Sequence, residues 1–463
     1  MTTPDRAIPQ PAETGGVSSL TETRAIAAIA LPLAAAYLAE IAMMVCDRII
    51  VGRLGGVELA AVGLVGDLAF ETLLFAMAVV SVVGVLIAQS TGAGDSAPIA
   101  HQVRQGLWVA TALAVPGTAV LWHLGPLLGL TAQDPEVIRL GDDYARPLAW
   151  CFLPSLWFIV LRQLLAARAR ANAVMAITVA AVFVNAGLTW VLVFGSLGLP
   201  ALGVAGAGWA TALVSWAMFA ALAFHVARAP GLAEFRIFAD LRAVDPALCR
   251  EILRLGLPVG GLALLEGGMF AVVAVLMGTL GAETLAANQV VVTVATIGLV
   301  IAIAIGEATA VRVAHAVGRG ISALPRKCGF LGLGAGLAVM SFSAAAFVIL
   351  PRPITGIFID TADPANAAVV AITAQLLVIA AVFQLADGTQ AIASRALRGL
   401  KDTTAPMWIA AVGYWGFGAT GGYVLCFPLG LGATGLWWGL ALGLTVTAAL
   451  LTWRFGAISR RAT

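Results

Sequence analysis

The sequence predicts an all-α integral membrane protein, with twelve transmembrane helices in two pseudo-symmetric six-helix lobes around a central cleft. Three observations predict it: long apolar stretches recur along the chain, basic residues gather in alternate loops, and the two halves resemble each other. Only 11% of the 463 residues are charged and 61% are hydrophobic, whereas about 25% of an ordinary soluble domain is charged. This composition argues strongly against a water-soluble fold.

Twelve apolar stretches are each long enough to cross a hydrocarbon core of about 30 Å as a helix. The 51 glycines suit close helix packing in lipid, where small residues let backbones approach. The polar ends, 1–24 and 455–463, are expected to be cytoplasmic tails, and the first apolar stretch is too long for a signal peptide. The expected spans are 26–52, 58–88, 103–123, 146–167, 171–195, 201–226, 252–278, 285–312, 328–350, 367–393, 406–427 and 432–453.

The loops between these spans alternate in their content of basic residues. If the N-terminal tail faces the cytoplasm, all but five of the 26 basic residues fall on the cytoplasmic side, as the positive-inside rule requires. A miscounted span would invert every later loop, so the asymmetry supports both the count and cytoplasmic termini. No basic cluster is interleaved with exposed aromatic residues, so nucleic acid is not an expected partner.

The two halves of the chain align when one is shifted by 226 positions, and the offset drifts by one to three residues in the later spans. The shift places Leu31 on Leu257 and Gly92 on Gly318, among other matches. Each copy contains an even number of spans, so the copies are related by an axis along the membrane normal. Two lobes built this way are expected to rock around a central cleft. The expected segments are an N-lobe at 25–226, a cytoplasmic linker at 227–251 and a C-lobe at 252–454.

Besides Glu58 at the first residue of its span, seven acidic residues fall within the expected spans, where a charge costs about 2.5 to 3.5 kcal/mol on insertion scales. Desolvation of a carboxyl favours a bound proton, whereas a bound cation favours the ionised form. We interpret Asp47, Glu266 and Asp387 as cation-coupling residues because they lie well inside their spans. Under the repeat, Asp47 and Asp387 each meet a valine rather than an acid. The other four acids are Glu40, Asp67, Glu71 and Glu307.

Those four acids leave a coupling role and a structural role open. Glu40 matches Glu266 under the 226-residue shift. Asp67 and Glu71 share a helix face at i and i+4, and such a pair can share one proton. Glu307 lies near the end of its span, which favours an ion pair with a basic neighbour.

Three uncharged polar residues, Asn185, Thr189 and Thr211, lie in the fifth and sixth expected spans. Their oxygen atoms can bind a cation or hydrogen-bond a neighbouring helix. The five cysteines are scattered, so neither a disulfide framework nor a metal-ligand spacing is expected. We expect no cofactor and no structural metal, with Na⁺ or H⁺ as the coupling ion at the acidic sites.

Five segments of the chain carry a family resemblance. In the first half they are DRIIVGRLGGVELAAVGL at 47–64, AQSTGAGD at 88–95 and QDPEVIRLGDDYARP at 133–147. In the second half they are LLEGGMFAVVAVLMGTLGAETLAANQ at 264–289 and FQLADGTQAIASRALRGLKDT at 383–403. Together they resemble the multidrug and toxic compound extrusion (MATE) family over nearly the whole chain, and the second pair resembles its NorM-like branch.

The resemblance implies an antiporter of the bacterial inner membrane that expels amphipathic, often cationic, organic compounds in exchange for Na⁺ or H⁺. We expect it to work as a monomer whose partners are drugs or organic cations and the lipid bilayer. Where the NorM-like branch often has a tyrosine, this sequence has Phe383. The implied residues are Glu266 and Asp387 for coupling, Asp47 with Asn185, Thr189 and Thr211 as an N-lobe cation site, and Pro32 as a hinge.

Three other functions are weighed against the antiporter. A lipid or lipid-linked oligosaccharide flippase would be favoured by a lateral groove lined with arginines, but the arginines fall mainly in the expected cytoplasmic loops. A membrane-embedded enzyme would need a nucleophile with its base or a metal cluster, and the chain has no GxSxG, HExxH or phosphate-cradling loop. A channel fits duplicated lobes less well. The sequence therefore predicts a transporter and not an enzyme.

Overall fold

The computed structural model describes residues 18–129 and 134–461, and almost all of them are helical. Residues 1–17 of the expected N-terminal tail lie outside the described residues. The first half contains α1 (Ser19–Gly52), α2 (Gly56–Val80), α3 (Val83–Gly92), α4 (Ala97–Trp122), α5 (Leu124–Leu128), α6 (Pro135–Ala149), α7 (Phe152–Ala167), α8 (Asn172–Phe194), α9 (Val204–Arg228) and the 3₁₀ turn η1 (Ala233–Phe235).

The second half repeats this order of long helices. It contains α10 (Pro246–Thr279), α11 (Ala282–Gly318), α12 (Leu324–Ile349), α13 (Pro351–Gly356), the 3₁₀ turn η2 (Pro364–Asn366), α14 (Ala367–Gly399), α15 (Thr404–Ala411), the π-helix η3 (Val412–Ala419), α16 (Thr420–Cys426) and α17 (Gly432–Arg461).

The membrane-spanning helices follow the expected spans closely. Within the described residues, ten helical segments are long and apolar enough to cross a membrane, and the pair α6 and α7, bent by 45°, makes an eleventh. The remaining expected span, 406–427, is covered by α15, η3 and α16, which run without a gap from Thr404 to Cys426. An all-helical, polytopic membrane fold is confirmed.

Two spans differ in detail from the expectation. The fourth, expected at 146–167, begins already at Pro135, because the charged residues of α6 hide its first half from a hydropathy pattern. The second, expected at 58–88, is divided into α2 and α3 at Ser81 and Val82. Helix α1 begins at Ser19, so Glu22, expected in the polar tail, lies inside a helix.

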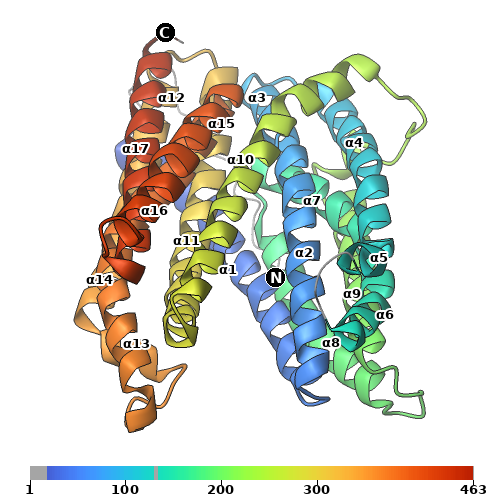
Figure 1. Cartoon of the computed structure of the whole chain (residues 1–463). Helices are drawn as coiled ribbons and strands as arrows, with labels where there is room; N and C mark the ends of the chain where they lie inside the picture. The colour runs from blue at the N-terminus through green and yellow to red at the C-terminus, as the bar shows by residue number, and fades with distance from the viewer. Residues whose placement is uncertain (1–17, 130–133, 462–463) are drawn as a thin grey trace.

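The two lobes meet through equivalent pairs of helices. Helix α1 packs against α11, and α2 packs against α10. The repeat relates α1 to α10 and α2 to α11, so exchanging the halves exchanges the two contacts. The lobes join at the end where the linker and the C-terminal end of α17 lie, and they spread apart at the other end (Figure 1). We call these the linker end and the open end.

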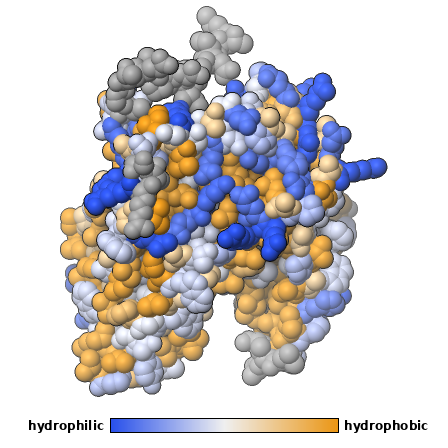
Figure 2. All heavy atoms as spheres, turned by 90° about the horizontal axis from the view of Figure 1, so that it is seen from above, coloured by the Kyte–Doolittle hydropathy of each residue, from blue (hydrophilic) through white to orange (hydrophobic). Residues whose placement is uncertain are grey.

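The hydrophobic packing also differs between the two ends. One core cluster contains buried residues from both lobes, such as Ile87, Ala167 and Val313. A second cluster, which includes Met269 and Trp437, draws its buried residues from the C-lobe alone. Seen from the linker end, hydrophilic residues cover much of the surface, and a notch separates two more hydrophobic projecting parts (Figure 2). The lobes thus share one core only near the linker end.

Two glycines allow this close approach of the lobes. A Cβ atom at Gly92 of α3 would lie 2.2 Å from the carbonyl oxygen of His315 on α11. A Cβ atom at Gly318 would lie 2.0 Å from the carbonyl oxygen of Gln89 on α3. The 226-residue shift relates Gly92 to Gly318 and Gln89 to His315, so the two contacts are the same contact seen from either lobe. Only glycine permits backbones to come this close.

Candidate cation-coupling sites

The first candidate site lies in the N-lobe, around Asp47 of α1. Asn185 and Thr189, one turn apart on α8, both donate to Oδ1 of Asp47, at 2.6 and 2.8 Å. Thr211 of α9 donates to Oδ2 at 3.3 Å. Asn185 and Thr189 are fully buried, and Asp47 is 7% exposed. The residues that the family resemblance groups around Asp47 are therefore brought together by three helices.

This arrangement suits either a proton or a small hard cation. In the described residues, Oδ1 of Asn185 is buried without a hydrogen-bond partner. An amide oxygen, two hydroxyl oxygens and a carboxylate thus lie within one small region, and hard cations prefer oxygen ligands. A proton on Asp47 would instead neutralise its buried charge. These oxygen atoms suit both Na⁺ and H⁺.

The second candidate site lies in the C-lobe, around Asp387 of α14, which is 2% exposed. Gln390, one turn further along α14, donates to Oδ1 of Asp387 at 3.2 Å. The hydroxyl of Tyr414 donates to Oε1 of Gln390 at 2.8 Å. Glu266 of α10 interacts electrostatically with Asp387 and by a hydrogen bond with Gln390. Two acids from two helices therefore share one polar network.

Tyr414 and Gln390 were not recognised as site residues from the sequence. Gln390 carried a signal, because it matches Gln163 in the internal repeat. Tyr414 is one of four tyrosines, and it lies within the π-helix η3. A π-helical turn is rare and frequently marks a functional site. Phe383, the residue that stands in place of a family tyrosine, instead packs edge-on against Phe270 and Trp437.

The matched acids Glu40 and Glu266 have different surroundings. Arg162 of α7 donates to Oε1 of Glu40 at 3.0 Å and lies over the ring of Tyr37. Glu266 forms no ion pair with any described residue, and the acid that acts on it most strongly is Asp387. The charge of Glu40 is therefore balanced by a basic side chain, whereas Glu266 has no such partner among the described residues.

The other two acids of the second span do not pair with each other. Asp67 forms an ion pair with Arg48 of α1, near the open end. Glu71 reaches across to α10, where a Cβ atom at Gly267 would lie 2.7 Å from Oε2 of Glu71. Gly267 follows Glu266 directly, so an acid of the N-lobe lies beside the acidic site of the C-lobe.

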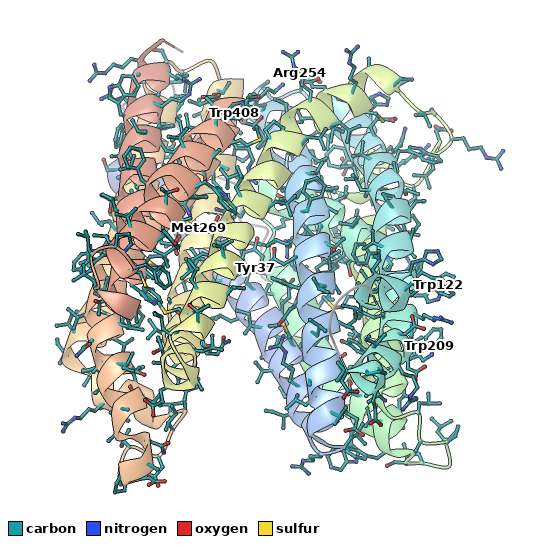
Figure 3. All side chains as sticks on the ribbon, in the orientation of Figure 1. Tyr37, Trp122, Trp209, Arg254, Met269 and Trp408 are labelled. Atoms are coloured by element: carbon teal, nitrogen blue, oxygen red, sulfur yellow. The ribbon has the colours of Figure 1, made fainter. Side chains whose placement is uncertain are left out.

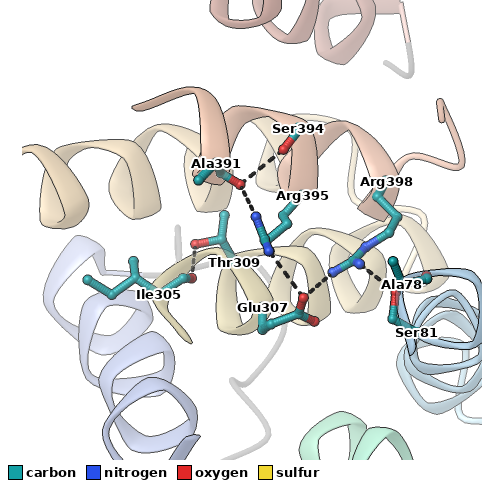
Figure 4. Close-up of polar contacts among 9 residues, drawn as sticks. All are labelled: Ala78, Ser81, Ile305, Glu307, Thr309, Ala391, Ser394, Arg395 and Arg398. Carbon is teal, nitrogen blue, oxygen red and sulfur yellow. Dashed lines mark hydrogen bonds and ion pairs between the residues drawn. The ribbon is translucent and has the colours of Figure 1, made fainter. Parts of the chain in front are cut away.

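Glu307 is buried in a network of ion pairs (Figure 4). It accepts hydrogen bonds from Arg395 at 3.1 Å and from Arg398 at 2.7 Å. Arg398 also donates to Oγ of Ser81, in the break between α2 and α3 of the other lobe, at 2.7 Å. The ion pair expected for Glu307 is present, and it extends to the opposite lobe.

A second buried ion pair joins the lobes at the linker end. Arg312 of α11 donates to both carboxylate oxygens of Glu22 on α1, at 2.7 to 3.0 Å. His315 donates to the carbonyl oxygen of Ala167 at 2.8 Å. Cys328 of α12 lies 3.5 Å from the same Glu22 carboxylate. These contacts have to separate before the linker end can open.

Comparison with known proteins shows which family has this architecture. The family model described as MatE matches residues 32–191 and 258–424, which together are more than half of the chain. The chain belongs to the MatE family. The two matched segments begin 226 residues apart, in agreement with the internal repeat. Pro32 is the first residue of the first matched segment, and it is buried within α1.

Curated relatives narrow the family to the NorM branch. The chain is 36% identical over 441 residues to a probable multidrug resistance protein NorM of Rhizobium meliloti, covering 95% of this chain and 94% of that protein. It is 39% identical to a probable NorM of Pseudomonas aeruginosa, covering 94% and 90%. It is 38% identical to the multidrug resistance protein NorM of Burkholderia vietnamiensis, covering 93% and 92%.

Solved structures agree on the MATE fold. A MATE protein in complex with MaL6 superposes with a TM-score of 0.86 at 19% identity, covering 95% of this chain and 97% of that one. An outward-facing multidrug resistance MATE transporter superposes with a TM-score of 0.85 at 19% identity, covering 96% and 97%. The chain is a NorM-like MATE multidrug efflux transporter, as its sequence predicted, and not an enzyme.

Proposed function

We propose that this MATE transporter is an antiporter that takes up Na⁺ or H⁺ and expels amphipathic, often cationic, organic compounds. The observation that carries the proposal is the pair of buried acidic sites, one in each lobe, which the internal repeat does not relate to each other. An ion and a cationic substrate that compete for one carboxylate exclude each other, and this exclusion is the basis of exchange. The coupling residues proposed are Asp47, Glu266 and Asp387.

We further propose that the linker end faces the cytoplasm of a bacterium, with both termini on that side of the inner membrane. The positive-inside asymmetry supports this orientation. The described structure is then closed to the cytoplasm and open to the outside, the state that releases a drug and receives an ion. Pro32 removes a backbone hydrogen bond from α1 and is proposed as the hinge of the N-lobe.

The driving force is sufficient for a multidrug exporter. A cation that moves inward gains about 2.3 kcal/mol per 100 mV, which corresponds to roughly a 50-fold concentration ratio of substrate. One chain holds both lobes and both acidic sites, so we propose a monomer as the working unit. Its lobes are proposed at 25–226 and 252–454, joined by a linker at 227–251.

The flippase alternative receives no support from the buried arginines. Such a transporter would need unpaired arginines along a lateral groove to hold an anionic head group. Arg162, Arg312 and Arg398 are each paired with a glutamate instead.

The coupling ion can be identified in everted membrane vesicles, whose lumen corresponds to the outside of the cell. The lumen is loaded with either Na⁺ or acid, and accumulation of a fluorescent organic cation is measured. We expect one of the two gradients to drive accumulation, and an ionophore for that ion to abolish it. If neither gradient drives accumulation beyond that of vesicles without the protein, the antiport proposal fails.

Removal of the Thr189 hydroxyl tests the N-lobe site. The change Thr189→Val keeps the shape but removes a hydrogen bond to a charged carboxylate, which contributes about 1.5 to 3 kcal/mol. We expect the coupling-ion concentration for half-maximal transport to change by about tenfold or more, while Thr189→Ser stays close to the parent. An unchanged ion dependence in Thr189→Val would remove Thr189 from the site.

Glu71 belongs to the N-lobe, so its negative charge can act on Glu266 of the C-lobe only while the two lobes are in contact. Substitution by Gln removes a negative charge beside Glu266, so we expect a shift of the pH profile of transport with little change in the maximal rate. The matched control is Glu58→Gln, in the first turn of the same helix. Identical pH profiles for parent and Glu71→Gln would show that Glu71 has a packing role only.

A further inference from the structure

A polar cavity lies at the linker end, away from both acidic sites. It has a volume of about 720 Å³ and is formed by the first three turns of α10 and the connection between α14 and α15. Its lining includes Arg250, Arg254 and Lys401, together with the acids Glu251 and Asp402. The proposed transport cycle uses none of these residues.

The charges in this cavity do not cancel. Lys401 forms an ion pair with Glu251 at 3.0 Å. Asp402 is paired with Arg454 of α17 at 2.6 Å. Both acids are therefore neutralised by their own basic partners. Arg250 and Arg254 form no ion pair with any described residue, although both line the cavity. The cavity thus carries two uncompensated guanidinium groups.

The two arginines can act together on one ligand. They are four residues apart on α10 and therefore lie on the same helix face, one turn apart. A guanidinium group binds a phosphate through two parallel hydrogen bonds, which makes arginine well suited to phosphate recognition. Thr403 and Thr404 add hydroxyl groups to the same lining. A phosphate-bearing anion matches this chemistry.

The position of the cavity along the membrane normal indicates whether that phosphate belongs to a lipid or to a soluble molecule. Trp408, one turn below Thr404 on α15, is 63% exposed, and Trp453, beside Arg454, is 71% exposed. Exposed tryptophans of membrane proteins gather at the level of the lipid head groups. Trp408 and Arg254 lie at the same end of the molecule, on neighbouring helices (Figure 3). The cavity is therefore at head-group depth rather than in bulk solvent.

We propose that this cavity is a binding site for the phosphate head group of an anionic phospholipid, held by Arg250 and Arg254. Basic pockets between transmembrane helices bind such head groups through the same combination of charge and depth. The site lies on α10, which packs against α2 of the other lobe. A lipid bound there holds the start of the C-lobe at the membrane surface.

The test uses the purified full-length protein in neutral detergent, titrated with spin-labelled phosphatidylglycerol or spin-labelled phosphatidylcholine. We expect the parent to prefer phosphatidylglycerol, and the double variant Arg250→Gln/Arg254→Gln to lose about tenfold or more in apparent affinity for it. The matched control is Arg228→Gln/Arg242→Gln, which removes two exposed positive charges outside the cavity and should bind like the parent.

Additional experiments distinguish lipid binding from a loss of folding and from the binding of free phosphate. The variant Arg250→Lys/Arg254→Lys restores the charges and should recover part of the affinity. Equal phosphatidylglycerol binding by the parent and the Gln variant would overturn the proposal, provided that both elute as single species. Displacement of the lipid by millimolar inorganic phosphate would assign the site to free phosphate and overturn the lipid assignment.

Discussion

Replacing Asp387 with Asn, or Glu266 with Gln, is expected to lower gradient-driven efflux by at least about tenfold, the loss expected when a charged partner worth about 1.5 to 3 kcal/mol is removed. A neutral amide keeps the size of the side chain but cannot exchange a proton or balance a cation. The measurement is drug accumulation in proteoliposomes under the gradient that drives the parent. Undiminished transport in both variants would remove coupling from the C-lobe site.

Two controls sharpen this prediction. Glu283→Gln makes the same change at an exposed acid in the first turn of α11 and should leave transport unchanged. The double variant of Glu266 and Asp387 should be no worse than the more severe single variant, because residues that act as one unit have non-additive effects. Additive losses would instead indicate two independent ion sites.

Substitution of Gly318 by Ala is expected to open the linker end and to reduce transport about tenfold or more. The added methyl group would lie 2.0 Å from a backbone oxygen of α3, where no side chain can move aside. The closed state is then destabilised by overpacking, which typically costs about 1 to 3 kcal/mol. Gly92→Ala should have the same effect, because the repeat relates the two contacts.

Cys328 can report this opening directly. It is fully buried next to the ion pair between Glu22 and Arg312. In a background where the other four cysteines are alanine, a maleimide should label Cys328 slowly in the parent and several-fold faster in Gly318→Ala. Gly334→Ala is the matched control, because it lies on the same helix as Cys328 with open space at its Cβ position. Equal labelling of the parent and Gly318→Ala would contradict the prediction.

The sequence was sufficient for the fold and for part of the N-lobe site. Apolar length, the charge asymmetry and the repeat depend on local patterns, and these determine which segments cross the membrane. The grouping of Asp47 with Asn185 and Thr189 came from the family resemblance, and the i, i+4 spacing on α8 is what makes it geometrically possible.

Contacts between the lobes could not be predicted in the same way. The approach of Glu71 to Gly267 and the pairing of Glu22 with Arg312 join residues that are about 200 and 290 positions apart. The repeat relates one copy to the other but gives no information on how the copies face each other in one conformation. Tyr414 was missed for another reason, since a π-helical turn has no apolar periodicity that differs from an ordinary span.

Arg398 contacts equivalent positions in the two lobes, and this restricts where a duplicated protein can place such a residue. Its guanidinium group bonds to Ser81 and to Glu307 at the same distance of 2.7 Å, and these two residues are themselves 226 positions apart. The group therefore lies close to the pseudo-two-fold axis that relates the lobes. A second arginine, related to Arg398 by that axis, would have to occupy nearly the same place. Two side chains cannot fill one volume, and the first half has the small residue Ala171 at the matching position. An arginine at this place can therefore come from one half of the chain alone, and here it comes from the C-lobe.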